Sequence, residues 1–237
     1  MLQTGRAPSA HMALVGDSAI AVAFGDNIDP FIHDRVMLFR EMVERLKIDG
    51  VVELVPGYCS LTVYYNPLET GASTLMTRLA QVITRHETDS PPSPRVRVIP
   101  VRYGEECGPD LETICRSAGI SAEEVIHLHT SRVYRVYMLG FLPGFPYMAE
   151  VAPAIAVPRL SVPRRSVPAG SVGIAGVQTG IYPVESPGGW RIIGRTPVQI
   201  YDPARRHPFL LAAGDRVRFR AIDRRHFDRL CRTQRRT

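Results

Sequence analysis

Residues 168–197, PAGSVGIAGVQTGIYPVESPGGWRIIGRTP, decide the fold class of the C-terminal half of this 237-residue chain. Short apolar runs such as Ser171–Ala175 alternate here with turns rich in glycine and proline. The wider stretch Gly140–Pro197 contains nine glycines and nine prolines. Because both residues disfavour helix interiors, long helices are excluded. Many short strands joined by such turns predict a compact β-barrel or sandwich.

The flanking sequence supports the same prediction. One short helix is expected near Pro109-Asp110. Another is expected from Ser121, where Glu124 three residues later makes a capping box. Further strands are predicted at Val133–Met138, Trp190–Ile193, Val198–Tyr201 and Val217–Phe219. We therefore assign residues 95–225 to a mainly-β barrel domain.

The N-terminal half has the pattern of an α+β domain, assigned to residues 13–94. Ser18–Phe24 alternates like a half-buried strand, and Asp29-Pro30 begins a helix that Gly50 ends. The apolar stripe of that helix comprises Ile32, Val36, Phe39, Val43 and Leu46. Two strands, a second helix and a last strand follow at Val51–Val55, Ser60–Tyr65, Leu75–Ile83 and Arg95–Val101. This order predicts a ferredoxin-like split β-α-β fold, with a hinge at Asp89–Pro94.

Composition narrows the functional class. The sequence has no apolar run of about 18 residues and no secretory signal pattern, so a cytoplasmic protein without a membrane span is expected. Cys59, Cys107, Cys115 and Cys231 form no Cys-x-x-Cys pair, and no metal site is expected.

The net charge of +6 resides in Asp215–Thr237, which holds nine arginines and three aspartates. Residues 226–237 are interpreted as a solvated, frayed basic tail, and nucleic acid is not an expected partner. Met12 is an alternative start.

Five blocks in the second half carry a resemblance to a known family. They are Gly140–Tyr147, Pro168–Val172, Gln178–Pro183, Ser186–Trp190 and Gly194–Pro197. In this order they resemble the 5-oxoprolinase B-subunit family, also called allophanate hydrolase subunit 1 or the kinase inhibitor KipI. The resemblance implies a cyclophilin-like barrel and a larger partner of the 5-oxoprolinase C-subunit / allophanate hydrolase subunit 2 type. It also implies a third component, of the 5-oxoprolinase A-subunit type.

The resemblance implies an ATP-dependent hydrolase subunit that turns 5-oxoproline into L-glutamate only with its partners. ATP, with Mg²⁺, is expected at a site that the partner can share, and no tightly bound cofactor is expected. Two alternatives stay open. One is an amide-handling, carboxyltransferase-type subunit of a urea-related pathway. The other is an inhibitor of a sensor histidine kinase, which would act without the partner subunit.

Opening a lactam with ATP requires donors for phosphoryl oxygens and a cation for the substrate carboxylate. No Gly-x-x-x-x-Gly-Lys-Ser/Thr loop is present. The backbone amides of Gly170 and Ser171 are candidate anion donors, with tight strand turns as the alternative. Arg159, Arg164 and Arg195 are candidate anion contacts, and Arg195 is also a candidate catalytic residue. His129 is a candidate general acid or base, with a structural role as the alternative.

The remaining candidates lie in the same motif blocks. Gln178, Thr179 and Tyr182 have side chains that form neutral hydrogen bonds with amides. Gly188 and Gly189 permit close approach of another molecule. Trp190 is expected in a pocket wall or as an anchor for the partner subunit, with a place in the barrel core as the alternative. Phe141, Phe145 and Tyr147 form an aromatic loop that is predicted to contact the partner subunit.

Overall fold

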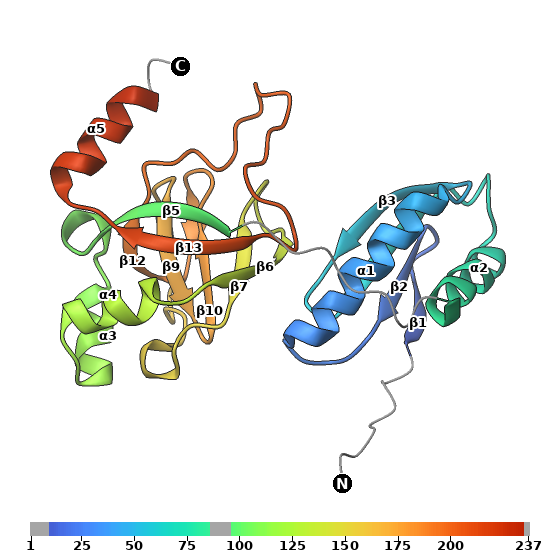
Figure 1. The fold of residues 1–237 in the computed structure, drawn as a ribbon, viewed down its shortest axis with the longest axis horizontal. Coiled ribbons are helices and arrows are strands. Elements are labelled where there is room, and N and C mark those ends of the chain that lie inside the picture. The colour runs from blue at the N-terminus through green and yellow to red at the C-terminus, as the bar shows by residue number, and fades with distance from the viewer. Residues whose placement is uncertain (1–9, 86–95, 235–237) are drawn as a thin grey trace, which may run out of the picture. The chain divides into compact units, whose positions relative to one another are not determined.

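The computed structural model describes residues 10–85 and 96–234, and the chain divides into two compact units (Figure 1). Residues 1–93 are called the N-terminal unit and residues 94–237 the barrel unit. The predicted hinge at Asp89–Pro94 lies outside the described residues. Within the described ranges, no helix has the length and apolar character needed to cross a membrane.

The N-terminal unit is a four-stranded sheet covered by two helices. The strands are β1 (His11–Val15), β2 (Ala19–Ala23), β3 (Val51–Pro56) and β4 (Ser60–Tyr65), in the order β1-β2-β4-β3, and all neighbours are antiparallel. The helices are α1 (Pro30–Leu46) and α2 (Ala72–Arg85). One buried cluster joins the strands to both helices, with Ile20, Val22, Leu61 and Val63 packed among Val36, Phe39, Leu75 and Leu79. Both helices therefore cover the same face of the sheet.

The ferredoxin-like arrangement is not confirmed, because its predicted last strand belongs elsewhere. That strand, β5 (Val96–Tyr103), pairs with strands of the barrel unit. The edge position beside β2 is instead taken by β1, a segment for which no strand was predicted. The sequence of β1, HMALV, has four apolar residues in a row and lacks the apolar–polar alternation of a half-buried strand, and the predicted domain start at residue 13 divides it.

Helix α1 begins as predicted but ends earlier. Asp29 accepts hydrogen bonds from the backbone nitrogens of Phe31 (2.7 Å) and Ile32 (3.0 Å), and Pro30 is the first helical residue. The helix ends at Leu46 because Lys47 adopts a left-handed conformation with φ of 44°. The predicted end at Gly50 is therefore wrong, and Leu46 is exposed rather than part of the buried stripe.

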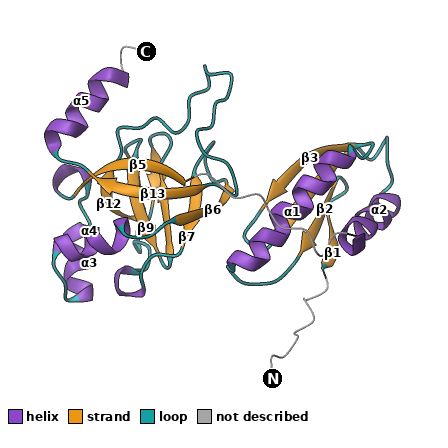
Figure 2. Ribbon diagram, in the orientation of Figure 1, coloured by secondary structure: helices purple, strands orange, loops and turns teal. Residues whose placement is uncertain are grey.

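The barrel unit confirms the prediction of a β-barrel (Figure 2). Seven strands close in the order β10-β7-β6-β13-β5-β12-β9. Besides β5, they are β6 (Tyr134–Leu139), β7 (Pro146–Ala149), β9 (Ser171–Ala175), β10 (Gln178–Ile181), β12 (Arg191–Arg195) and β13 (Arg216–Ala221). Only the β5–β13 pair is parallel. A separate two-stranded sheet joins β8 (Arg164–Val167) to β11 (Ser186–Gly188).

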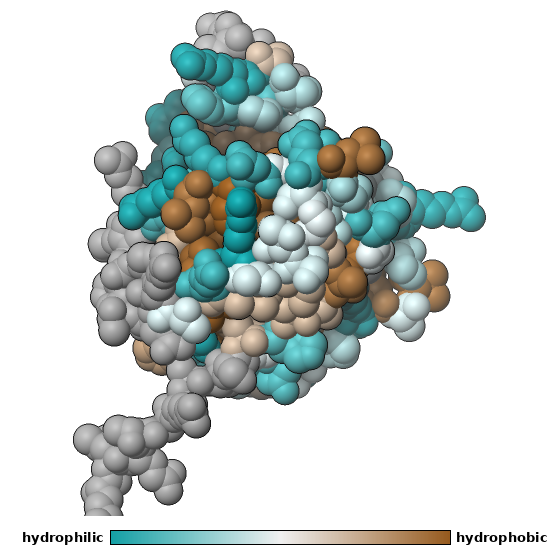
Figure 3. All heavy atoms as spheres, turned by 90° about the vertical axis from the view of Figure 1, so that its right-hand side faces the viewer, coloured by the Kyte–Doolittle hydropathy of each residue, from teal (hydrophilic) through white to brown (hydrophobic). Residues whose placement is uncertain are grey.

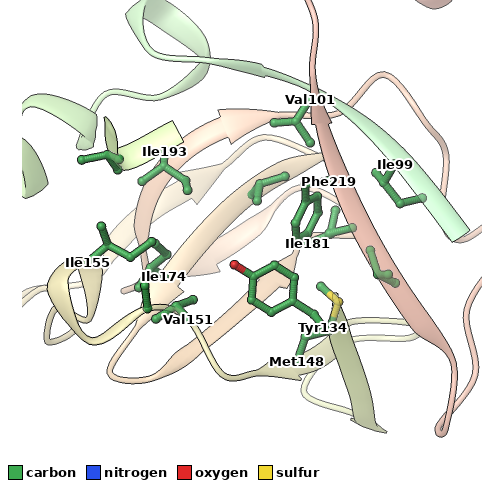
Figure 4. Packing of buried hydrophobic residues seen from close by; sticks show 14 of the residues in the cluster. Ile99, Val101, Tyr134, Met148, Val151, Ile155, Ile174, Ile181, Ile193 and Phe219 are labelled. Carbon is green, nitrogen blue, oxygen red and sulfur yellow. The ribbon is translucent and has the colours of Figure 1, made fainter. Parts of the chain in front are cut away.

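The interior of the barrel is a packed apolar core (Figure 4). Tyr134, Val172, Ile174 and Phe219 converge there from three strands. All five residues of β9 are nevertheless buried, because its outer face is covered as well. Ala175 belongs to a second cluster, which includes Phe145, Tyr182 and Trp190 and is called the aromatic cluster. A strand buried on both faces explains why Ser171–Ala175 lacks polar alternation.

Helices and short turns complete the barrel unit. They are the 3₁₀ turns η1 (Glu105–Cys107) and η2 (Pro153–Ile155), and the helices α3 (Leu111–Ala118), α4 (Ala122–Thr130) and α5 (Arg224–Gln234). The capping box is confirmed on its N-cap side, since Ser121 Oγ accepts a hydrogen bond from the backbone nitrogen of Glu124 at 3.1 Å.

Two predictions for this unit are wrong. The strand expected at Val198–Tyr201 is absent from the described structure, where Tyr201 makes only an isolated bridge to Phe209. The supposed frayed tail is largely helix α5, whose start is capped by Asp223 Oδ1 accepting from the backbone nitrogen of His226 at 2.7 Å.

Exposed apolar side chains of the N-terminal unit are scattered over several elements. Phe31 at the start of α1 is 80% exposed, Val52 on β3 is 72% exposed, and Leu68 after β4 is 94% exposed. Figure 3 shows separate apolar patches between polar residues on the face turned to the viewer. Apolar residues that are exposed singly are ordinary on protein surfaces, so they do not identify a binding face.

Candidate functional site

Three of the five motif blocks meet at one open groove of about 800 Å³ in the barrel unit. Ser171 at the start of β9 lies opposite Arg195 at the end of β12, so the adjoining loops share one end of the barrel. The groove is lined by Ala169, Gly170, Pro183, Val184, Glu185, Arg195, Thr196, Pro197, Val198, Gln199, Tyr201, Pro203, Phe227, Asp228 and Cys231. Its size is within the range of small-molecule sites.

Arg195 is the cationic side chain of this groove. Its Nε donates a hydrogen bond of 2.8 Å to the carbonyl oxygen of Ala169, which holds the guanidinium in place. Among the described residues its terminal nitrogens have no carboxylate partner. By contrast, Arg102 is bound by Glu105 and Glu106, and Arg164 by Asp110. Arg195 is thus a pre-positioned guanidinium free to bind a carboxylate in a bidentate manner.

Gly170 makes this positioning possible. Its φ is +81°, and a Cβ at this position would lie 2.4 Å from the carbonyl oxygen of Thr196. Only glycine permits both the conformation and the close approach. The turn before β9 can therefore pack onto the end of β12, where Ala169 contacts Arg195.

The predicted anion cradle in residues 170–176 is contradicted by the structure. The backbone nitrogen of Gly170 donates to Tyr182, that of Ser171 to Pro168, and that of Gly176 to Val157. The intervening strand β9 is paired on both sides, and Ser171 is buried. Because these amides are already bonded, the glycines serve the barrel turns, which was the alternative interpretation.

His129 is buried in the barrel interior and does not line the groove. Its ring stacks on Phe219 at 4.6 Å between centroids. Thr179 Oγ1 donates to the carbonyl oxygen of Gly173 (3.0 Å), so it accepts from His129 Nε2 (3.0 Å). His129 Nδ1 then accepts the hydrogen bond of the Tyr103 hydroxyl at 2.8 Å. Both ring nitrogens are satisfied, which favours a structural role for His129 and for Thr179.

Burial lowers the pKa of His129 from 6.5 to about 3, so the folded protein keeps the ring neutral. The unfolded chain is protonated below pH 6.5. The unfolded state therefore gains stability as pH falls from 6.5 toward 3, and the folded state loses it. We expect the free energy of unfolding to drop by about 2 kcal/mol more in the wild type than in His129→Gln between pH 7 and pH 5.

Fluorescence of Trp190, the single tryptophan, during urea unfolding measures this difference in the barrel unit. The glutamine variant is the control for all other titrating groups. Its side-chain amide keeps one hydrogen-bond donor and one acceptor but does not titrate. Parallel pH profiles of the two proteins would contradict the neutral, buried histidine.

Arg164 and Arg159 lie beside the aromatic cluster. Arg164 donates to Asp110 Oδ1 at 2.7 Å, while Asp110 Oδ2 accepts from the backbone nitrogen of Ile192 at 2.6 Å. This ion pair connects β8 to the start of α3 and leaves Arg164 occupied, which argues against its predicted role as an anion contact. Arg159 is exposed, and its guanidinium lies 5.8 Å from the ring centroid of Trp190.

The predicted aromatic residues separate into buried and exposed groups. Phe145 and Trp190 are 1% and 4% exposed and pack edge-to-face at 5.3 Å. The prediction that Phe145 forms a subunit interface is therefore wrong. Trp190 is buried as its alternative interpretation stated, but in the aromatic cluster and not in the barrel interior. Phe141, at 62% exposed, and the half-buried Tyr147 remain accessible.

Gly188 and Gly189 also have different surroundings. A Cβ on Gly188 would lie 2.3 Å from the Tyr182 hydroxyl, so the close approach is to a buried neighbour rather than to a ligand. Tyr182 itself is buried, and burial raises its pKa. A Cβ on Gly189 would make only an ordinary contact, 3.7 Å from the Pro163 side chain. Gln178 is half-buried on β10 opposite Ala149 and is not among the groove residues.

Helix α5 supplies groove residues that the sequence analysis missed. Phe227, Asp228 and Cys231 line the groove opposite the motif blocks. Phe227, Leu230 and Cys231 are half-buried at helical spacing, a signal that would have distinguished this segment from a frayed tail. Glu185 was also missed, and its Oε1 accepts a hydrogen bond from Ser166 at 2.8 Å.

The groove does not fit a magnesium–nucleotide complex. Among its described lining residues, one guanidinium accompanies two carboxylates, Glu185 and Asp228, which repel a polyphosphate. Among the described residues, no group of three or more His, Cys, Asp or Glu side chains is placed to hold a metal ion. A small ligand with one carboxylate suits these charges better.

Comparisons with known proteins show the family to which this chain is related. The protein-family model for the carboxyltransferase domain, subdomain C and D, matches residues 10–211. The 5-oxoprolinase B subunit of Bacillus subtilis (strain 168) is 41% identical over 227 residues, covering 90% of this chain and 93% of that protein. The protein of the same name from Escherichia coli O157:H7 is 40% identical over 207 residues, with coverages of 87% and 93%.

Two longer proteins are similar as well. The crystal structure of TTHA0988 aligns with a TM-score of 0.77 and 41% identity, covering 86% of this chain, which spans only 40% of the TTHA0988 chain. The urea amidolyase of Lachancea kluyveri is 25% identical over 246 residues, covering 90% of this chain and 13% of that protein.

Proposed function

The chain belongs to the 5-oxoprolinase B-subunit family, and we propose that it is one subunit of an ATP-dependent 5-oxoprolinase. The complex hydrolyses 5-oxoproline to L-glutamate when this chain is joined by its partners. These are a larger protein of the C-subunit type and a third component of the A-subunit type. The chain contributes part of the substrate site rather than a complete active site.

The observation that carries this proposal is the unpaired guanidinium of Arg195. 5-Oxoproline has one carboxylate, and its lactam nitrogen and carbonyl are neutral. Arg195 binds the carboxylate, and the fixed Nε–Ala169 contact orients the two terminal nitrogens. The neutral lactam is then held in the groove without a second anion near Glu185 and Asp228.

ATP binds on a partner protein in this proposal. Phosphorylation of the lactam oxygen is the chemistry that ATP supplies to ring opening, and it requires several cations and a metal ion. The described lining of the groove has one guanidinium, so no step of phosphoryl transfer is assigned to this chain. Its contribution is to bind and orient the carboxylate end of the substrate.

Reconstitution tests the proposal. We expect ATP-dependent release of glutamate from 5-oxoproline when this chain is mixed with its C-type and A-type partners. No release is expected when any one of the three proteins is omitted. Release that persists without this chain would refute the proposal.

The urea-related alternative is favoured by one observation, the distant similarity to a urea amidolyase. Under this alternative the chain handles a urea-type amide for a carboxyltransferase. The same reconstituted proteins would then consume carboxybiotin with a urea-type amide and leave 5-oxoproline unchanged. Measuring both substrates on one preparation distinguishes the two activities.

A further inference from the structure

Helix α5 presents two chemically different faces. His226, Phe227, Leu230 and Cys231 are half-buried, and Phe227 and Cys231 line the groove of the barrel unit. Arg225, Arg229 and Arg232 are exposed at spacings of four and three residues. At about 100° per residue, these three side chains fall within about 60° of one another and opposite Phe227. We call these three residues the arginine face.

The arginine face has no compensating charge in the part of the chain that the structure describes. Arg225, Arg229 and Arg232 form no ion pair there, whereas the neighbouring Arg224 approaches Asp228 at 3.9 Å. The other two aspartates of residues 215–234 also have partners. Asp223 caps the start of α5, and Asp215 pairs with Arg97 at 3.3 Å. Three guanidiniums therefore repel one another along about 10 Å of helix.

The strand before this helix adds to the same excess of positive charge. Arg218 and Arg220 on β13 are exposed, alternate with the buried Val217 and Phe219, and have no ion pair among the described residues. The family match ends at residue 211. The arginine face therefore lies outside the portion of the chain that the family model matches.

We propose that the arginine face docks an acidic surface of the larger, C-type partner protein, one that presents at least three carboxylates within about 10 Å. The inference rests on the proposed function, because one member of a protein complex needs contact surfaces for the others. Carboxylates pair with guanidinium in a bidentate manner, and an acidic helix repeats at the same spacings of three and four residues.

Other anionic partners fit less well. None of the described residues in 216–234 is an exposed aromatic, so single-stranded nucleic acid finds no stacking platform. The apolar face of α5 is turned to the groove, so it is not available to enter a lipid surface. Charge complementarity with a protein carboxylate cluster is the interaction that remains.

The test compares the affinity of the larger, C-type partner for four forms of this chain. They are the wild type, the triple variant Arg225→Gln/Arg229→Gln/Arg232→Gln, the same triple change to lysine, and the control Arg116→Gln/Arg132→Gln/Arg206→Gln. The control removes three other exposed arginines and the same charge. Glutamine and lysine are good helix formers, so α5 is expected to persist in these variants. Far-ultraviolet circular dichroism of each variant checks its helix content.

We expect the glutamine triple variant to bind about 10- to 100-fold more weakly at 50 mM salt. The control should bind like the wild type, and the lysine variant should retain most of the affinity. At 500 mM salt the difference should shrink, because the Debye length falls to a few ångströms.

Each other outcome rejects the inference in a recognisable way. If the wild type and the glutamine triple variant bind the partner equally well, the arginine face is not the docking surface, and the proposed function is untouched. If the wild type forms no complex with the partner, the proposed assembly fails along with this inference. If the arginine face binds a 20-base-pair DNA duplex but not the partner, its ligand is nucleic acid.

Discussion

Replacing Arg195 by alanine is expected to lower kcat/KM of the reconstituted enzyme for 5-oxoproline by roughly 10²-fold, or about 2.7 kcal/mol. The guanidinium is held by Ala169 and has no carboxylate of its own among the described residues, so the substrate carboxylate is its natural partner. An anchor that binds substrate and transition state alike affects KM. Most of the loss is therefore expected in KM rather than in kcat.

Initial rates over a range of 5-oxoproline concentrations measure this effect. Arg195→Lys keeps the charge but loses the bidentate geometry, and an intermediate KM is expected. Arg191→Ala is the matched control, because Arg191 lies at the other end of β12 and outside the groove. If Arg195→Ala and Arg191→Ala have the same kinetic constants, the carboxylate does not bind at Arg195.

Replacing Asp110 by alanine is expected to destabilise the barrel unit by about 3 kcal/mol. Asp110 is 5% exposed and accepts hydrogen bonds from both Arg164 and the backbone nitrogen of Ile192. Its removal leaves a buried N–H without a partner and a guanidinium without its carboxylate. The Arg164 side chain is 31% exposed and regains some water, which keeps the loss at the lower end of values for buried pairs.

Urea unfolding followed by Trp190 fluorescence measures this loss, because the tryptophan lies in the same unit. Asp110→Asn retains an acceptor for Ile192 and is expected to lose only about 1–2 kcal/mol. A double-mutant cycle with Arg164→Ala isolates the ion pair, with an expected coupling of about 1–2 kcal/mol. A coupling near zero would mean that the ion pair with Arg164 does not stabilise the fold, and that Asp110 acts only through its hydrogen bond with Ile192.

Local patterns predicted the elements that depend on neighbouring residues. The Asp29-Pro30 start of α1, the Ser121 cap of α4 and the strand Ser171–Ala175 all appear in the structure. The five motif blocks also predicted the family, which a family model over residues 10–211 and relatives of 40–41% identity show. Each of these features is decided by residues a few positions apart, which is the range over which capping and periodicity act.

Local patterns failed where the partner of a segment is distant. The run Arg95–Val101 was predicted as a strand, but only the closed sheet places it beside β13 rather than β2. Residues 226–237 were predicted to be a frayed tail because their charges dominate their composition. The half-buried residues among them instead find apolar neighbours at the groove.

Sequence patterns were sufficient to predict the β-barrel and to name several arginines as candidate anion contacts. Only the tertiary structure distinguished Arg195 from Arg164 and removed His129 from the site. The reason is that the role of a charged or titratable group depends on its partner. Arg164 meets Asp110 from 54 residues away, and His129 meets Thr179 from 50 residues away. Such pairings arise when the barrel closes, and no local spacing encodes them.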